Sequence, residues 1–362
     1  MNRRAFSSRR QFLRRSMALA GTAALGPAWV KAAQPHYTML FAHTFTQASE
    51  QFVVTGIELF KDKAEEYSEG ALRVDIHEGG KLGGQTDLPL KVQYGAVQAC
   101  QVSAQNFTPY AEVFNVLDLP FLFPDNDVFN AFLESSDFVS SELMTDPQQR
   151  GLRVLQGMWA NTGTRIICVS NRAARQVIVP DDLRGLKQRV TNSKIEQQTF
   201  DLTPASPVSV DWGETYQAMQ QGAVDSLHVG LGPLTANRIH EVLSTGTRLD
   251  MSLNAHVTVL SQDWYEKLPT DIQKAINQAA KESWAHQKLE QAKADERMWA
   301  EWEEMGIQVS DLNEDERAQW IAAVGHQRPE WDQWKERYGS DLYEEIIHFT
   351  DNYKSTHQDD QS

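Results

Sequence analysis

Two four-residue stretches, Tyr94-Gly95-Ala96-Val97 and Gln221-Gly222-Ala223-Val224, decide the fold. Each ends a segment of helical character and opens an apolar, strand-like run, which reaches Val102 in the first case and Val229 in the second. Glycine is favoured just past a helix end because it adopts positive φ without strain. The same helix, glycine and buried strand recur 127 positions apart and predict two lobes that are built alike. An ordinary helix-to-strand junction, used twice, is the alternative.

The segments around the first stretch alternate between strand and helix. Residues 37–42 form an apolar run, Gln51 to Tyr67 carries apolar residues at helical spacing, and residues 72–77 alternate as a strand does. Asp87 can cap a short helix that ends at Tyr94. Strands that alternate with helices predict an α/β fold.

A long uninterrupted helix is predicted for residues 270–304, which contain no glycine or proline and repeat apolar residues every three to four positions. At 1.5 Å per residue this helix is about 50 Å long, longer than one small lobe. We therefore expect it to cross from one lobe to the other. The expected first lobe comprises residues 33–160 and about 255–296, the second comprises residues 161–254 and about 297–353, and residues 354–362 are expected to be a disordered tail.

The first 32 residues have the pattern of a twin-arginine-type signal peptide. Residues 8–14 contain the paired arginines, an apolar stretch follows from Met17 to Val30, and small residues precede a cleavage site after Ala32. About fourteen apolar residues are too few to span a bilayer core of roughly 30 Å. The interpretation is a periplasmic protein whose mature chain does not insert into the membrane, because no later run reaches eighteen apolar residues.

The mature chain is strongly acidic. Seven of the 34 basic residues and none of the 49 acidic ones lie in residues 1–32, which leaves 27 basic against 49 acidic residues, a net charge of −22. Such a surface excludes nucleic acid and anionic membranes as partners. A bound anion must then be held by a few local arginines or by helix N-termini.

A search for catalytic or metal-binding motifs returns nothing that predicts an enzyme. The sequence has no G-x-S-x-G, H-E-x-x-H, phosphate-binding loop or C-x-x-C motif, and its ten histidines lack metal-ligand spacing. No cofactor or metal is expected. The two cysteines, Cys100 and Cys168, lie in separate apolar runs; buried free thiols are the favoured interpretation, and a disulfide between them stays open.

Two arginines in apolar surroundings are candidates for anion binding. Arg165 opens a strongly apolar strand, and Arg189 stands near the end of another, just before the capping pattern Ser193-x-x-Glu196. Ligands of open α/β sheets bind outside the carboxyl ends of the strands, where helix N-termini also point. A guanidinium holds a carboxylate through two parallel hydrogen bonds. Either arginine could instead be an ordinary surface or packing residue.

Several blocks, in order along the chain, resemble the solute-binding subunits of TRAP (tripartite ATP-independent periplasmic) transporters. The blocks are Leu117-Asp118-Leu119-Pro120-Phe121-Leu122-Phe123, residues 182–190, residues 214–225, and Leu268-Pro269 before the long helix. The resemblance implies a two-lobed, periplasmic-binding-protein-like α/β fold that closes by a hinge. It also implies capture of a small organic acid and its delivery to an ion-driven TRAP permease, without enzymatic activity.

The resemblance also implies site residues. Arg189 matches the arginine that clamps the ligand carboxylate, Arg165 matches a second basic cleft position, and Trp212 falls where an aromatic ring stacks on the ligand. Other positions that fall in the cleft are Asn192, His43, Gln85, Ala104 and Gln105. After Asp225 the sequence departs from the family, so that His228 or Val229 occupies a place often held by a ligand-binding Asn or Glu.

That departure argues against sialic acid and simple dicarboxylates and favours a smaller or less hydroxylated ligand. Two other functions stay open from the sequence: an exported sensor domain that presents the same ligand to a receptor, and an exported enzyme built on this scaffold. Both would use the same cleft, so the sequence by itself does not separate them.

Overall fold

A computed structural model describes residues 35–46, 51–135, 143, 145, 147–338 and 340–357 of the chain. The predicted signal peptide, residues 1–32, lies outside the described residues, as do the last five positions of the predicted tail, 358–362. Among the residues that are described, the structure contains no helix both long and apolar enough to cross a bilayer.

The N-terminal half of the sheet consists of three parallel strands in the order β2-β1-β3. Helix α1 covers one face of them and buries the apolar stripe that its sequence predicts, which includes Val53, Ile57 and Phe60. The elements of this half are β1 (Tyr37–His43), α1 (Gln51–Tyr67), β2 (Leu72–His77), α2 (Leu88–Gln93), β3 (Ala99–Ser103), α3 (Ala104–Phe107), η1 (Glu112–Asp118) and α4 (Asn126–Glu134).

The C-terminal half repeats this arrangement, with three parallel strands in the order β6-β5-β7. Its elements are η2 (Pro180–Leu183), β5 (Lys187–Val190), α6 (Lys194–Asp201), β6 (Ser206–Ser209), η3 (Trp212–Glu214), α7 (Thr215–Gln221), β7 (Ser226–Gly230), α8 (Leu231–Ala236) and η4 (Ile239–Val242).

The two glycine stretches form the same turn in both halves. Gly95 and Gly222 adopt positive φ of 72° and 74°, which an L-residue reaches only with strain. The backbone hydrogen bonds of the two turns also correspond. Gly95 donates to Val92 while Ala96 and Val97 both donate to Lys91, and Gly222 donates to Met219 while Ala223 and Val224 both donate to Ala218.

The residue that follows each turn ties its strand to the neighbouring one in the same way. The N–H of Gln98 donates to the carbonyl of Leu40, and the Gln98 side chain accepts from the N–H of Leu40 at 3.1 Å. Asp225 makes the same two bonds to Lys187, with its carboxylate accepting at 3.0 Å. The predicted echo is therefore a structural repeat.

Two long strands, β4 (Leu152–Ser170) and β8 (Leu243–Ser261), join the halves into one sheet of order β2-β1-β3-β8-β4-β7-β5-β6. They pair antiparallel with each other, and β8 also pairs with β3 while β4 pairs with β7. The sequence predicts a strand that opens at Arg165, whereas this residue lies inside β4. The register of β4 against β8 shifts between Asn161 and Thr164 and again between Thr164 and Ile166, where Arg165 lies, and these shifts let the strand bend and continue.

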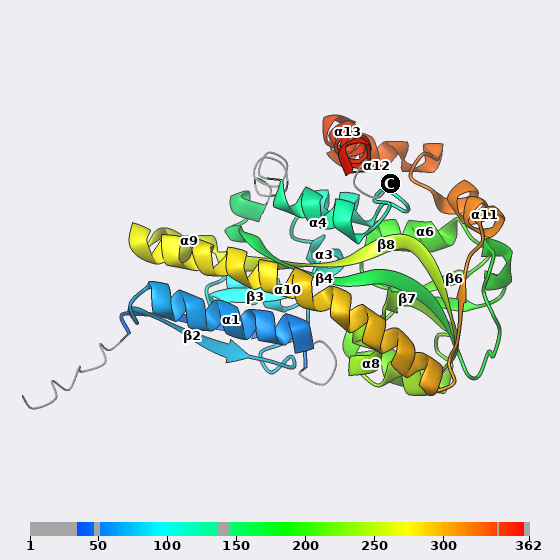
Figure 1. Cartoon of the computed structure of the whole chain (residues 1–362), viewed down its shortest axis with the longest axis horizontal. Coiled ribbons are helices and arrows are strands. Elements are labelled where there is room, and N and C mark those ends of the chain that lie inside the picture. The colour runs from blue at the N-terminus through cyan, green and yellow to red at the C-terminus, as the bar shows by residue number, and fades with distance from the viewer. Residues whose placement is uncertain are drawn as a thin grey trace, which may run out of the picture. The chain divides into compact units, whose positions relative to one another are not determined.

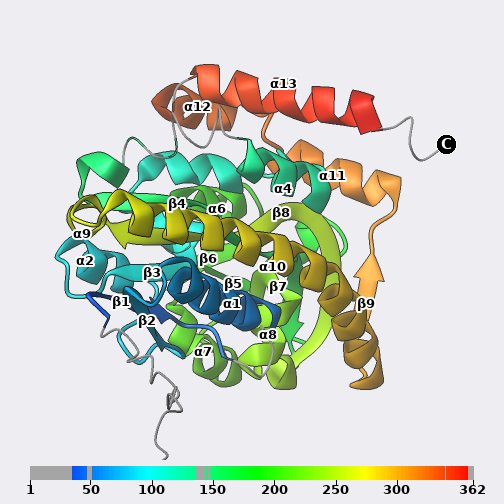
Figure 2. The ribbon, with the colours of Figure 1, turned by 60° about the vertical axis from the view of Figure 1, so that its left-hand side comes forward.

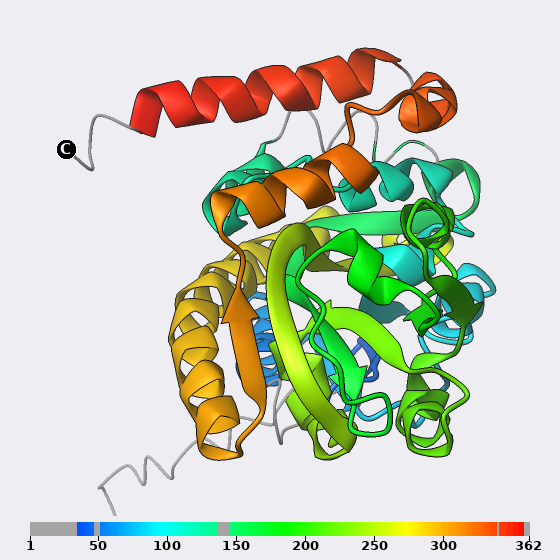
Figure 3. The ribbon, with the colours of Figure 1, turned by 90° about the vertical axis from the view of Figure 1, so that its right-hand side faces the viewer.

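Helix α10 (Thr270–Glu304) has the predicted limits and runs diagonally across the sheet (Figure 1). It contacts α1 in the N-terminal half and α8 and β9 (Gln308–Asp311) in the C-terminal half, as the length argument predicts. The short α9 (Gln262–Glu266) precedes it, and Figure 3 shows β9 beside the bowed strand β8, with which it pairs.

The C-terminal helices gather on the side of α4 (Figure 2). The structure continues α13 to His357, although the predicted tail begins at residue 354; residues 354–356 are exposed, and the helix is held to the molecule upstream of them, where Phe349 meets Phe132 of α4 with ring centroids 5.8 Å apart. These elements are α11 (Glu314–Val324), η5 (Pro329–Trp331), α12 (Asp332–Tyr338) and α13 (Ser340–His357).

The two cysteines are buried free thiols, which confirms the favoured interpretation. Cys100 and Cys168 belong to different apolar clusters, one on each side of the sheet. Burial raises the pKa of both thiols, so neither is prone to ionise.

Candidate functional site

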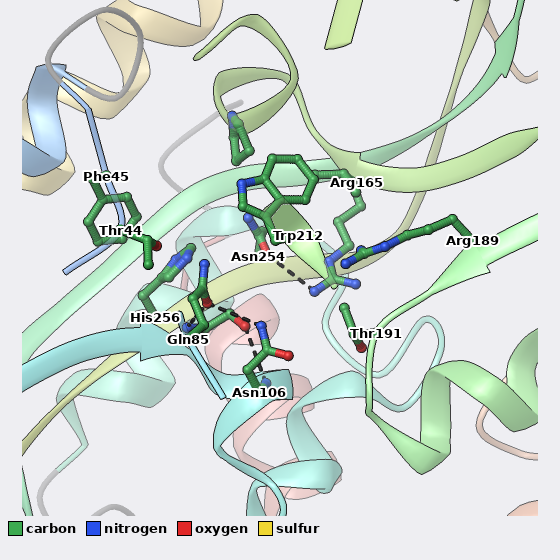
Figure 4. A pocket seen from close by; sticks show the side chains of 13 residues that line it. Thr44, Phe45, Gln85, Asn106, Arg165, Arg189, Thr191, Trp212, Asn254 and His256 are labelled. Carbon is green, nitrogen blue, oxygen red and sulfur yellow. Dashed lines mark hydrogen bonds between the residues drawn. The ribbon is translucent and has the colours of Figure 1, made fainter. Parts of the chain in front are cut away.

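A pocket opens where the parallel strands of both halves end, at the carboxyl edges of β1, β3, β5 and β7 (Figure 4). This is the place that the strand-end rule predicts for an open α/β sheet. Its cavity has a volume of about 40 Å³. The lining residues are Thr44, Phe45, Gln85, Ser103, Asn106, Asn254 and His256 around the N-terminal half, and Arg165, Arg189, Thr191, Trp212, Val229 and Pro233 around the C-terminal half.

The lining follows the internal repeat. Thr44 and Thr191 are each the first residue after the strands β1 and β5, and both face the pocket. Gln85 and Trp212 each stand three residues before α2 and α7, respectively. The pocket is thus built from equivalent positions, and the halves differ in the side chains placed there.

Strand pairing extends the correspondence to the crossing strands. His256 of β8 is paired with Ser103, the last residue of β3, and Arg165 of β4 is paired with Gly230, the last residue of β7. Arg165 and His256 therefore occupy equivalent places on opposite sides of the pocket. Burial and the nearby Arg165 lower the pKa of His256 to about 3, so this imidazole is neutral.

The guanidinium of Arg165 is paired through its two terminal nitrogens, whereas its buried Nε has no hydrogen-bond partner among the described residues. Its Nη1 lies 3.2 Å from Oε1 of Glu196, its Nη2 lies 3.2 Å from Oδ1 of Asn254, and the side chains of the ion pair are each 4% exposed. The second carboxylate oxygen of Glu196 accepts the N–H of Thr191 at 2.7 Å and also its hydroxyl. Arg165 consequently carries a charge that the protein itself neutralises.

Arg189 is buried but has hydrogen-bonding capacity left over. Its Nε donates to the carbonyl of Val210 at 3.0 Å, and its guanidinium lies 5.6 Å from the ring centre of Trp212. Its Nη1 and Nη2 have no hydrogen-bond partner among the described residues, and Figure 4 shows them in the same space as Arg165. Burial lowers the pKa of Arg189 to about 10, so the group stays charged at neutral pH.

A second buried carboxylate stands behind Arg165. Asp118, from the family signature, accepts a hydrogen bond from the Gln105 side chain at 2.5 Å and is 6% exposed. Burial raises the pKa of Asp118 to about 6, while the nearby Arg165 opposes this shift. The charge of Arg165 is thus shared with two acidic groups.

The N-terminal wall is neutral and polar. The Gln85 side-chain carbonyl accepts from the N–H of Ser103 at 2.8 Å and from the Asn106 amide at 3.2 Å. Within the described part of the chain, the Gln85 NH2 group and the Asn106 side-chain oxygen have no hydrogen-bond partner, which leaves one donor and one acceptor for a ligand.

A second cavity, of about 360 Å³, adjoins the pocket and shares Thr44, Gln85, Asn106 and Trp212 with it. The glycine-rich loop of residues 79–84 and the segment of residues 211–214 form its sides. Trp212 is thus one of four residues that line both cavities.

Five predicted site residues lie together in the pocket lining: Arg189, Arg165, Trp212, Gln85 and Val229. Five others lie outside it. Asn192 is exposed and accepts from the Ser209 hydroxyl at 3.1 Å, because the chain has turned outward one residue after the pocket-lining Thr191. Ala104 is buried in the apolar core and Gln105 binds Asp118, while the neighbouring Ser103 and Asn106 face the pocket.

The two histidines predicted for the site are also outside the lining. His43 is fully buried on the side of the sheet that carries Phe41, with ring centroids 6.4 Å apart, and burial lowers its pKa to about 4. His228 packs against Phe200 of α6 with ring centroids 5.9 Å apart, and burial lowers its pKa well below the usual value. Alternate residues of a strand face opposite sides, so Val229 lines the pocket and His228 does not.

Sequence reasoning missed Asn254 and His256, Thr44 and Phe45, Ser103 and Asn106, Thr191, and Pro233. Asn254 and His256 stand two apart inside an otherwise apolar run, which is a detectable signal of a shared strand face. Thr44 directly follows the first strand and was accessible from the strand-end rule. Across the residues that the structure describes, no three His, Cys, Asp or Glu side chains group together as a metal site.

The family model for the bacterial extracellular solute-binding proteins of family 7, named DctP, matches residues 41–336. The chain belongs to this family. It is similar to the C4-dicarboxylate-binding periplasmic protein DctP of Vibrio cholerae, with 27% identity covering 70% of this chain and 73% of that protein. It is also similar to the 2,3-diketo-L-gulonate-binding periplasmic protein of Escherichia coli, with 24% identity covering 80% of this chain and 85% of that protein.

Solved structures confirm the fold. A TRAP periplasmic solute-binding protein of Anaerococcus prevotii with bound D-glucuronate has a TM-score of 0.80 at 22% identity, covering 88% of this chain and 99% of that chain. One of Sulfurospirillum deleyianum with bound succinate has a TM-score of 0.77 at 22% identity, covering 87% and 99%. Family membership makes this chain an extracytoplasmic solute-binding protein and not an enzyme.

Proposed function

We propose that this protein captures a small organic acid in the pocket between the two halves and delivers it to a TRAP permease. The observation that carries the proposal is Arg189, a buried guanidinium at the end of β5 whose two terminal amino groups have no hydrogen-bond partner among the described residues. A carboxylate fits this fork through two parallel hydrogen bonds.

The ligand is proposed to bind both halves at once. Its carboxylate lies on Arg189, the indole of Trp212 covers an apolar face, and polar groups at the other end meet Gln85 and Asn106. A ligand that contacts both lobes favours the closed state over the open one. The two lobes predicted from the sequence are proposed as the moving parts. The chain passes from one lobe to the other near residues 160, 254 and 296.

Support for the ligand class comes from relatives. The curated relative of Vibrio cholerae is named for C4-dicarboxylates, and solved relatives hold succinate and D-glucuronate. These ligands share one chemical feature, a carboxylate. We propose the same feature for the ligand here, together with export through the twin-arginine signal and cleavage after Ala32.

A thermal-shift screen of the chain that starts at residue 33, against a panel of organic acids, tests the proposal. Binding to the native state raises the melting temperature, by an amount equivalent to about 2.7 kcal/mol at a hundred times the Kd. At least one acid is expected to raise it, and Arg189→Ala is expected to abolish the rise. A flat response to every acid contradicts the proposal.

Delivery to a permease is tested by uptake of the acid found in the screen. Uptake is expected to require both this protein and a TRAP permease. Uptake that persists without this protein, combined with loss of a transcriptional response to the acid, identifies the protein as a sensor instead.

A further inference from the structure

Building on the proposed function, we infer that the pocket selects a monocarboxylate. One carboxylate binds Arg189, and the opposite end of the ligand is a neutral hydroxyl, carbonyl or amide group. Glu196 is the side chain that excludes a second carboxylate. Relatives of this fold hold both monocarboxylates and dicarboxylates, so the fold itself does not decide the class.

The pocket lining contains two positively charged side chains. Arg165 and Arg189 are its only Lys or Arg side chains, and every residue of this lining is described by the structure. Arg165 is paired with Glu196 at 3.2 Å and bound to Asn254 at the same distance. One positive charge therefore remains for the ligand, and it belongs to Arg189.

The side chain of Glu196 is held in place by hydrogen bonds. Its N–H donates to the hydroxyl of Ser193 at 3.2 Å, and its carboxylate accepts from both the N–H and the hydroxyl of Thr191. The side chain cannot turn away to release Arg165 without losing the two bonds from Thr191 to its carboxylate. If Arg165 turned to a ligand, the carboxylate of Glu196 would be left buried without its partner, which is strongly unfavourable.

The pocket wall formed by the N-terminal half has no positively charged side chain. The internal repeat places Ala42 at the position equivalent to Arg189, since Ala42 pairs with Cys100 as Arg189 pairs with Leu227. It places the neutral His256 opposite Arg165. A second carboxylate in the N-terminal half would thus meet no cation, and it would face the side-chain oxygen of Asn106. A hydroxyl group, which both donates and accepts, matches Asn106 and Gln85.

Matched pairs of acids test the inference in the unmodified mature protein by calorimetry. The pairs are malonate with malonamate, succinate with succinamate, and glutarate with glutaramate, in which one carboxylate is replaced by an amide of the same shape. For the chain length that binds best, the amide is expected to bind at least tenfold more tightly than the diacid. A diacid that binds equally well or better overturns the inference.

The substitution Glu196→Gln tests the proposed cause. It keeps the shape of the side chain but frees the charge of Arg165, so the preference for the amide is expected to fall by at least tenfold. Glu266→Gln removes the same charge from an exposed position and is the control, with an unchanged preference. An unchanged preference in Glu196→Gln overturns the role of Glu196.

The outcomes separate this inference from the proposed function. A diacid preference in the unmodified protein overturns the inference and leaves organic-acid capture standing. Failure of every acid, with or without a second carboxylate, contradicts organic-acid capture itself. If Glu196→Gln does not fold, as judged by circular dichroism, the matched pairs in the unmodified protein still decide the ligand class.

Discussion

The two halves of the sheet share a frame and differ at the ligand. Gly95 and Gly222 form turns with the same hydrogen bonds, and Gln98 and Asp225 tie neighbouring strands together in the same way. At the pocket, however, the C-terminal half carries both arginines, whereas the N-terminal half presents only neutral side chains.

The residues that form the shared frame are therefore different from the residues that line the pocket. The frame depends on backbone hydrogen bonds, on a glycine that tolerates positive φ and on one side-chain acceptor in each half. The side chains that line the pocket make none of these bonds and differ between the halves. Under the proposed function, recognition of charge is therefore confined to one half, and the other half binds the neutral part of the ligand.

The largest expected effect is on the free energy of unfolding, in which loss of Arg165 and loss of Arg189 are expected to differ. Arg165→Ala leaves Glu196 buried without its partner and is expected to lower the free energy of unfolding by about 3–5 kcal/mol. Arg189→Ala is expected to change it by less than about 1 kcal/mol, because no carboxylate among the described residues is paired with this guanidinium and its charge is disfavoured by burial, as its lowered pKa indicates. Urea unfolding of both variants, without ligand, provides the measurement. Equal losses would contradict the distinction.

The free energy of unfolding is expected to depend on pH through Asp118. Burial raises the pKa of this group to about 6 in the folded state. Its protonation therefore stabilises the fold at low pH, and this contribution is lost as the pH rises from about 4 through 6. Relative to Asp118→Asn, the unmodified protein is expected to lose about 3 kcal/mol between pH 4 and pH 7. Chemical unfolding at both pH values measures this difference, and parallel profiles would refute it.

The structural repeat is tested by a pair of glycine substitutions. Gly95→Ala and Gly222→Ala each force a residue with a Cβ into a φ above 70° and are each expected to cost about 1–2 kcal/mol in the free energy of unfolding. Gly222→Ala is expected to cost slightly more, since the new methyl group would lie 2.9 Å from the exposed side chain of Arg172. Thermal unfolding compares them. If only one variant lost stability, the turns would not be equivalent.

The smallest expected effect concerns Asn192. The family resemblance implies a cleft position, but the structure places this side chain on the surface with Ser209. Asn192→Ala is expected to change the Kd for the acid identified by the screen by less than threefold, as measured by calorimetry. A larger change would show that Asn192 reaches the ligand when the halves close.

Local patterns in the sequence were sufficient for most elements of the fold. Helices α1 and α10 have the limits that their apolar spacing predicts, and Ser193 caps α6 as its capping pattern indicates. The continuous strands β4 and β8 were not predicted. Their pairing joins residues far apart in the chain, and the shifts in register that let them bend leave no local signature.

The candidate site was predicted less completely. Arg165 and Arg189 were identified, but nothing local to Arg165 revealed that Glu196 neutralises it from another segment. At the strand ends the predicted residues and the residues that line the pocket differ by one position: Asn192 against Thr191, and Ala104 and Gln105 against Ser103 and Asn106. A pattern of apolar residues fixes which face a strand buries, but it does not fix where the chain turns away from the pocket.

Calorimetric titration of Arg189→Ala with the acid identified by the screen tests the central claim most directly. Because a desolvated carboxylate loses its partner, at a cost of about 3–5 kcal/mol, affinity is expected to fall by roughly 10²–10³-fold or more. Arg189→Lys should restore little of it, since an ammonium lacks the fork, and the exposed Arg184→Ala should match the unmodified protein. A change of less than threefold in Arg189→Ala would contradict the claim that this guanidinium holds the ligand.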